Sequence, residues 1–195
     1  CLITLLTGGP LKRLVVTVIC LAAAPFITAC DTGTAADDEV EADLTTVTGA
    51  ILSLQQCWEE ADIDTYETLF ADDFVFYFDD GDVGGDIPAS WGLQEELDAA
   101  ANIFDNVGAN NIELTLTMPD GFDEPEDDTC TINGVAYDIR VTVPDDDIIY
   151  PAQGMCNFSL EQTDGEWRFT TWYDLVGYRL LGGVYTSWGY IKAMD

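Results

Sequence analysis

The fold is decided by the stretch Leu69-Phe70-Ala71-Asp72-Asp73-Phe74-Val75-Phe76-Tyr77-Phe78-Asp79-Asp80, in which helical spacing gives way to a strand. Phe74, Phe76 and Phe78 share one face of that predicted strand, and Val75 and Tyr77 share the other. Because both faces are apolar, we expect the strand to be covered on both sides. The elements that follow are predicted to pack on it.

Helical spacing flanks this strand on both sides. Before it, an apolar stripe predicts a helix to about residue 61, and Asp64 is a plausible N-cap for a short second helix. After it, Ser90 is predicted to cap a third helix that ends near Asn106, before Gly108. The stripe of the first helix consists of Val47, Ile51, Leu54 and Trp58, and that of the third of Leu93, Leu97, Ala100, Ala101 and Phe104.

The remainder of the chain predicts antiparallel strands. Residues 112–118 alternate between apolar and polar types, which is typical of a strand with one solvated face. Asn133-Gly134 predicts a two-residue hairpin turn, and Asp164-Gly165 predicts another. In the last strand, alternation places Trp167, Phe169, Thr171 and Tyr173 on one face and Arg168, Thr170 and Trp172 on the other.

The N-terminal region has the features of an export signal. Lys12-Arg13 precedes an apolar run from Leu14 to Ile27, which is short for a membrane span of about 20 residues. Ile27-Thr28-Ala29-Cys30 resembles the bacterial lipobox, which implies cleavage before Cys30 and attachment of diacylglycerol to its thiol. A plain cleavable signal and an uncleaved anchor are the alternatives.

These features divide the chain into four segments. We expect a lipoprotein signal peptide at residues 1–29, a flexible acidic tether at 30–44, a folded domain at 45–174 and an apolar, glycine-rich extension at 175–195. A lipid anchor on Cys30 would place the domain in the bacterial cell envelope, outside the cytoplasm.

Charge narrows the classes of partner and of chemistry. The chain has 37 acidic and 6 basic residues, no His and a net charge of -31. Nucleic acid is therefore excluded as a partner, because phosphate binding requires a basic face. The acidity indicates a solvated shell or, alternatively, a cation-binding surface. Without His, catalysis would depend on carboxylates, Tyr or Cys.

The sequence predicts no cofactor and no metal. The acidic segment 79–86 contains Asp80, Asp82 and Asp86, but the closing Glu of a calcium-binding loop is missing at the required spacing. We expect an acidic turn there.

Two motifs carry a resemblance to a known superfamily. Leu69-Phe70-Ala71-Asp72-Asp73-Phe74 and the hairpin Gly165-Glu166-Trp167-Arg168 followed by Trp172 resemble the NTF2-like proteins, which include SnoaL-like and ketosteroid isomerase-like members. The resemblance covers residues 45 to 174. It implies an α+β cone, in which a curled, mostly antiparallel sheet packs on about three N-terminal helices and a pocket opens at the wide end.

The resemblance also tests for catalysis. The oxyanion-binding Tyr of the isomerases falls on Leu54, and their proton-transferring Asp falls on Phe78, with Asp79 one residue later. The second oxyanion donor falls near Cys156 or Asn157. Because Leu54 and Phe78 cannot transfer protons, the known isomerase chemistry is expected to be absent. Asp79, Tyr77 and Asp138 remain as candidate catalytic residues.

Several residues are candidates for a ligand pocket, although the pattern of the aromatic ones favours an ordinary core. Arg140 could orient a ligand or could pair with Asp138 on its own strand face. For a protein outside the cytoplasm we expect a disulfide between Cys130 and Cys156, with Cys57 reduced. The pocket candidates are Leu54, Trp58, Phe76, Phe78, Trp91, Arg140, Asn157 and Trp172.

The sequence favours a non-catalytic, lipid-anchored module that binds a small apolar ligand or another envelope protein. One alternative is an isomerase or dehydratase with atypical acid and base residues. Another is a structural envelope lipoprotein that self-associates, and a homodimer formed through the sheet is a related expectation.

Overall fold

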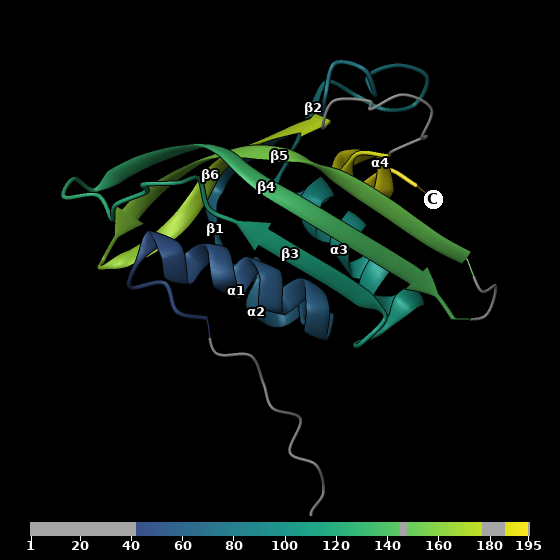
Figure 1. Cartoon of the computed structure of the whole chain (residues 1–195), viewed down its shortest axis with the longest axis horizontal. Helices are drawn as coiled ribbons and strands as arrows, with labels where there is room; N and C mark the ends of the chain where they lie inside the picture. Colours follow the sequence, from purple (N-terminus) through teal and green to yellow (C-terminus); the bar gives the residue numbers. More distant parts are fainter. Residues whose placement is uncertain (1–41, 145–147, 177–185, 195) are drawn as a thin grey trace, which may run out of the picture. The chain divides into compact units, whose positions relative to one another are not determined.

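The computed structural model describes residues 42–144, 148–176 and 186–194 (Figure 1). The predicted signal segment and the predicted lipidation site, Cys30, lie outside these residues. The helices are α1 (Val47–Glu60), α2 (Ile63–Thr68), α3 (Leu93–Val107) and α4 (Trp188–Lys192). The strands are β1 (Phe70–Tyr77), β2 (Ser90–Gly92), β3 (Ile112–Thr117), β4 (Thr129–Val143), β5 (Ile148–Thr163) and β6 (Glu166–Val176).

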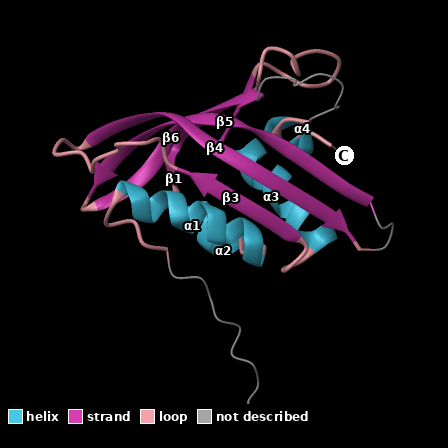
Figure 2. Cartoon of the chain, in the orientation of Figure 1, coloured by secondary structure: helices cyan, strands magenta, loops and turns pink. Residues whose placement is uncertain are grey.

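The strands of the described residues form a six-stranded sheet in the order β2-β1-β6-β5-β4-β3. β1 and β6 are parallel and the other neighbouring pairs are antiparallel. The sheet is curled, and the helices lie together on one side of it (Figure 2). This architecture confirms the predicted α+β class with a mostly antiparallel curled sheet.

The helix α1 packs on the sheet through the predicted stripe. Val47, Ile51, Leu54 and Trp58 are each at most 1% exposed. The helix begins after Thr46, whose side chain accepts a hydrogen bond from Gly49 N. The carboxylate of Glu124 accepts hydrogen bonds from the first two amides of the helix, Val47 N and Thr48 N. Glu124, which lies between β3 and β4, therefore caps α1 at the end where the helix dipole favours negative charge.

The strand β1 begins earlier than its spacing predicts. It starts at Phe70, and its pairing with β6 is irregular between Phe70 and Val75, which leaves Asp72 and Asp73 exposed. After the irregularity the aromatic alternation holds, and Phe74 and Phe76 are at most 1% exposed.

A β-bulge in β6 overturns the predicted faces of that strand. Leu160 of β5 pairs with Phe169, whereas Ser159 pairs with Thr171, so one extra residue enters β6. The extra residue exchanges the faces downstream of it. Trp172 is fully buried, while Tyr173, which was predicted to share the face of Phe169, is 42% exposed.

Three further local predictions are wrong. Asn133-Gly134 does not form a hairpin turn but a bulge within β4, because the neighbouring β5 is long enough to continue past it. Ser90 belongs to β2, and α3 begins after Gly92, whose N–H donates to the side chain of Glu95. The N-cap of α2 is Asp62, which accepts from Thr65 N, and not Asp64.

Within the described ranges, no helix is long and apolar enough to cross a membrane.

Candidate functional site

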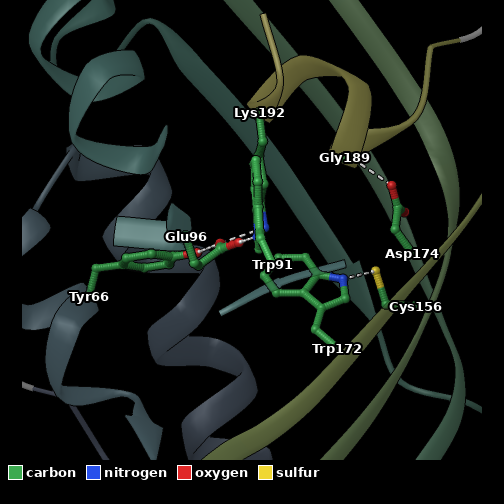
Figure 3. Close-up of polar contacts among 8 residues, drawn as sticks. All are labelled: Tyr66, Trp91, Glu96, Cys156, Trp172, Asp174, Gly189 and Lys192. Carbon is green, nitrogen blue, oxygen red and sulfur yellow. Dashed lines mark hydrogen bonds and ion pairs between the residues drawn. The ribbon is translucent and has the colours of Figure 1, made fainter. Parts of the chain in front are cut away.

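The interior on the helical side of the sheet contains a buried carboxylate with three donors (Figure 3). Glu96 of α3 is fully buried, and its Oε1 accepts from the hydroxyl of Tyr66 and from Lys192 Nζ, the latter at 2.6 Å. Its Oε2 accepts from Trp91 Nε1 at 2.9 Å. The Lys192 side chain is also inaccessible to solvent, so this is a fully buried ion pair.

Glu96 and its three partners come from four different elements. Tyr66 lies on α2, Trp91 on β2, Glu96 in the first turn of α3 and Lys192 in the last turn of α4. Burial raises the pKa of Tyr66, and the nearby Glu96 carboxylate raises it further, so the phenol remains a hydrogen-bond donor. Burial lowers the pKa of Lys192, and Glu96 opposes this effect.

A second buried carboxylate, Asp174 of β6, holds the start of α4. Asp174 is 1% exposed, and its Oδ2 accepts from Gly189 N at 2.6 Å. Burial raises the pKa of Asp174 to about 6, although the hydrogen bond from Gly189 lowers it. Next to it, the Tyr137 hydroxyl accepts from Trp188 N at 3.2 Å. The carboxyl of Asp174 therefore titrates close to neutral pH.

The cysteines contradict the predicted disulfide. Cys57, Cys130 and Cys156 are free thiols. Cys130 of β4 lies opposite Leu160, whereas Cys156 of β5 lies opposite Val135, so the bulge-containing ladder keeps the two thiols several residues out of register. Cys156 Sγ instead accepts from Trp172 Nε1 at 3.0 Å.

Burial also makes these thiols poor nucleophiles. It raises the pKa of Cys57 to about 12 and places that of Cys156 well above its usual value. Neither group can supply a thiolate at neutral pH.

The structure gathers most of the predicted pocket residues in the interior. The rings of Phe76 and Phe78 are 4.9 Å apart, and that of Phe76 lies 5.6 Å from Trp91 and 5.3 Å from Trp172. Leu54 and Trp58 are fully buried on the facing surface of α1. Trp188 of α4 packs against these side chains, with its ring 5.0 Å from that of Trp58 and 4.5 Å from that of Trp172.

Two other pocket candidates lie elsewhere. Arg140 is exposed on β4, opposite Glu113 and Pro151, because its strand position faces solvent. Asn157 is half-buried in β5 and accepts from Gly134 N at the β4 bulge, which gives it a structural role.

The three candidate catalytic residues do not converge. Asp138 is exposed and accepts from Gln153 Nε2. Tyr77 stacks on Tyr173, with ring centroids 4.3 Å apart and planes 8° from parallel. Asp79 accepts from Gly81 N in the turn after β1.

The sequence patterns did not point to Glu96, Asp174 or Lys192 as site residues. Lys192 carried a usable signal, because it is the only lysine after Lys12 and lies in an apolar tail of a very acidic chain. Asp174 carried none without the bulge, since simple alternation assigns it to the face of Trp172 but assigns that face to solvent.

A cavity of about 550 Å³ lies outside the buried cluster formed by Glu96 and its partners Tyr66, Trp91 and Lys192. Trp91 and Lys192 form part of its wall and Met194 another part, and Asp86 and Asp98 add two carboxylates. The cavity therefore adjoins the Glu96 network on one side and carries negative charge.

Solved structures of similar fold come from several bacteria. A conserved protein from Planctomyces limnophilus matches with a TM-score of 0.52 and 17% identity, over 68% of this chain and 94% of its own. A proposed aromatic ring hydroxylase from Novosphingobium aromaticivorans matches with a TM-score of 0.51 and 18% identity, over 67% of this chain and 86% of its own. An uncharacterised protein with a cystatin-like fold from Caulobacter vibrioides matches with a TM-score of 0.51 and 12% identity, over 69% of this chain and 89% of its own.

These comparisons establish the fold, and at such identities they establish nothing further. The described domain has the NTF2-like, or cystatin-like, cone fold that the sequence motifs suggested. No protein-family model matches the sequence, and no curated protein does.

The buried ion pair should show strong energetic coupling. We expect Glu96→Gln and Lys192→Met each to lower the free energy of unfolding by about 3–5 kcal/mol, because each leaves a buried charge without its partner. The double variant should lose clearly less than the sum of the two. Urea denaturation of the four proteins measures the coupling, and additive losses would contradict it.

Asp174 should make stability depend on pH in a defined direction. Its pKa is about 6 in the folded protein and 3.8 for an ordinary Asp side chain, as in the unfolded chain. The folded protein therefore binds the proton more tightly than the unfolded chain does. The resulting stabilisation, about 3 kcal/mol, is complete below pH 4 and is lost as the pH rises through 6.

Asp174→Asn removes this titration and keeps an oxygen that can accept from Gly189 N. The stability of wild type relative to this variant should therefore decrease between pH 4 and 7. Denaturant unfolding of both proteins across this range measures the difference, and parallel curves would show that Asp174 does not titrate there.

Proposed function

We propose that the protein is a lipid-anchored lipoprotein of the bacterial cell envelope whose NTF2-like domain binds a small molecule or another envelope protein without catalysis. The observation that carries this proposal is the placement of the ionisable groups. Asp138 and Tyr77 point away from the interior cluster, and Glu96 is neutralised by Lys192. Apart from Asp174, a bound substrate would therefore meet aromatic surface and not a free acid and base.

Binding in the interior requires α4 to move, because its side chains fill the space. Trp188 is fully buried, and its ring lies 5.0 Å from Trp58 and 4.5 Å from Trp172. Trp172 lies on β6 and Trp58 on α1, so both would stay in place to line the vacated site. Aromatic walls of this kind are typical of small-molecule sites.

Native mass spectrometry of the purified, membrane-extracted protein tests for the ligand. We expect a noncovalent mass that dissociates on unfolding and whose addition changes amide hydrogen exchange in residues 186–194 and β6. Exchange differences confined to other segments would show that the ligand binds outside the cone. The same spectra report the homodimer that we expect through the sheet.

The lipid anchor makes a separate prediction. Cys30→Ala should abolish palmitate labelling and release the protein from membranes, because the lipobox thiol is the acceptor. Cys20→Ala, which changes another cysteine of the predicted leader, is the matched control and should remain labelled and membrane-bound. Continued labelling of Cys30→Ala would contradict lipidation at this residue.

A second candidate function rests on Asp174. A buried carboxyl with a pKa of about 6 can accept a proton at neutral pH, as an isomerase or dehydratase requires. This candidate predicts that Asp174→Asn abolishes turnover of an unsaturated ketone, followed by ultraviolet absorbance, whereas Asp79→Asn does not.

A further inference from the structure

The ammonium group of Lys192 lies inside a box of aromatic rings. Its Nζ is 3.5 Å from the centroid of Trp172 and 4.1 Å from that of Phe76. The rings of Trp58 and Trp188 lie at 5.8 and 5.4 Å. All four distances are within the range in which a ring face attracts a cation, and such boxes are used to bind ammonium ligands.

Three of the four rings of this box do not belong to α4. Trp58 lies on α1, Phe76 on β1 and Trp172 on β6. Glu96, which supplies the negative charge, is held by Tyr66 and Trp91 independently of Lys192. If α4 left, a desolvated carboxylate and three aromatic faces would remain in place, and an uncompensated carboxylate in such surroundings strongly favours a cation.

Two features of α4 would make its displacement from the domain easier. It has only five residues. Among the described residues, the buried Nε1 of Trp188 has no hydrogen-bond partner, which destabilises the seated helix. The contact at Gly189 is close and tolerates no side chain, since an added Cβ would lie 3.0 Å from both Asp174 Oδ2 and Phe78 Cδ1.

A cavity borders the box on the side of Trp91 and Lys192. The cavity of about 550 Å³ shares Trp91 and Lys192 with the buried cluster. Its carboxylates, Asp86 and Asp98, and the net charge of -31 on the whole chain attract cations.

We propose that Lys192 is an internal occupant of a binding site for an organic ammonium ion, formed by Trp58, Phe76, Trp172 and Glu96 and opened by displacement of α4. This inference rests on the proposed function, since it gives the chemical class of the ligand that the cone binds. α4 is then an intrinsic competitor: the apparent dissociation constant for the ligand rises as the fraction of molecules with an open site falls.

The chemistry of the box favours an organic cation over a metal ion. Glu96 is the carboxylate at its centre, whereas calcium and magnesium require several oxygen ligands. No cluster of metal-binding side chains occurs in the part of the chain that the structure describes. A primary or methylated ammonium, by contrast, needs one counter-charge and several ring faces.

Chemical rescue of Lys192→Ala tests the assignment in the full chain. This substitution removes the atoms that correspond to propylammonium, so propylammonium chloride should bind the variant roughly tenfold more tightly than wild type and raise its Tm. Sodium chloride at equal ionic strength and neutral 1-propanol should have neither effect. Tryptophan fluorescence and thermal unfolding are the two measurements.

The double variant Lys192→Ala/Glu96→Gln is the control for charge, and it should lose the preference for propylammonium over 1-propanol. Equal effects of both compounds on Lys192→Ala would overturn the proposal, because they indicate an apolar hole. If Lys192→Ala is unfolded, recovery of folding by propylammonium alone supports the proposal, and no recovery overturns it.

A variant that keeps Lys192 tests the role of α4. Gly189→Ala should unseat the helix sterically and increase binding of tetramethylammonium chloride several-fold, whereas Tyr190→Ala, at a residue of α4 that is 43% exposed, should not. Unchanged binding in Gly189→Ala would show that α4 does not compete for the site. A neutral ligand bound in the cone, without any response to ammonium ions, would leave the proposed function standing and remove this inference alone.

Discussion

The interior of the domain depends on one contact, the ion pair between Lys192 and Glu96. Both side chains are removed from water, which costs several kcal/mol for each ion before their attraction is counted. Such a pair is maintained only when other groups satisfy it, and here Tyr66, Trp91 and the surrounding rings do so. The placement of α2, β2, α3 and α4 is therefore linked through a single carboxylate.

The ion pair also affects how the interior of the NTF2-like cone could be used in this chain. In the described residues the space between helices and sheet is filled by the chain itself, with Trp188 and Lys192 as the filling groups. The cone is thus both a hydrophobic core and a potential site. Its ligand binding would be coupled to local unfolding of a five-residue helix and not to entry into an open pocket.

The sequence predicted the parts that depend on short-range periodicity. The stripe from Val47 to Trp58, the aromatic alternation of β1 and the fold class follow from repeated spacing, which local sterics and burial enforce. The site could not be predicted in the same way. Glu96 and Lys192 are 96 residues apart, and the faces in β6 depend on an inserted residue that its alternation does not reveal.

The bulge in β6 has a consequence for the outside of the domain as well. By turning Trp172 and Asp174 inward, it turns Tyr173 outward onto Tyr77, so that two tyrosines stack on the far side of the sheet. The number of residues in β6 therefore decides which of its side chains face the interior and which face solvent. Loss of a single residue between Trp167 and Trp172 would bury a phenol and expose an indole and a carboxylate, although every side chain of the site would still be present. For this domain, the length of β6 is as much a determinant of its chemistry as the identity of any residue in it.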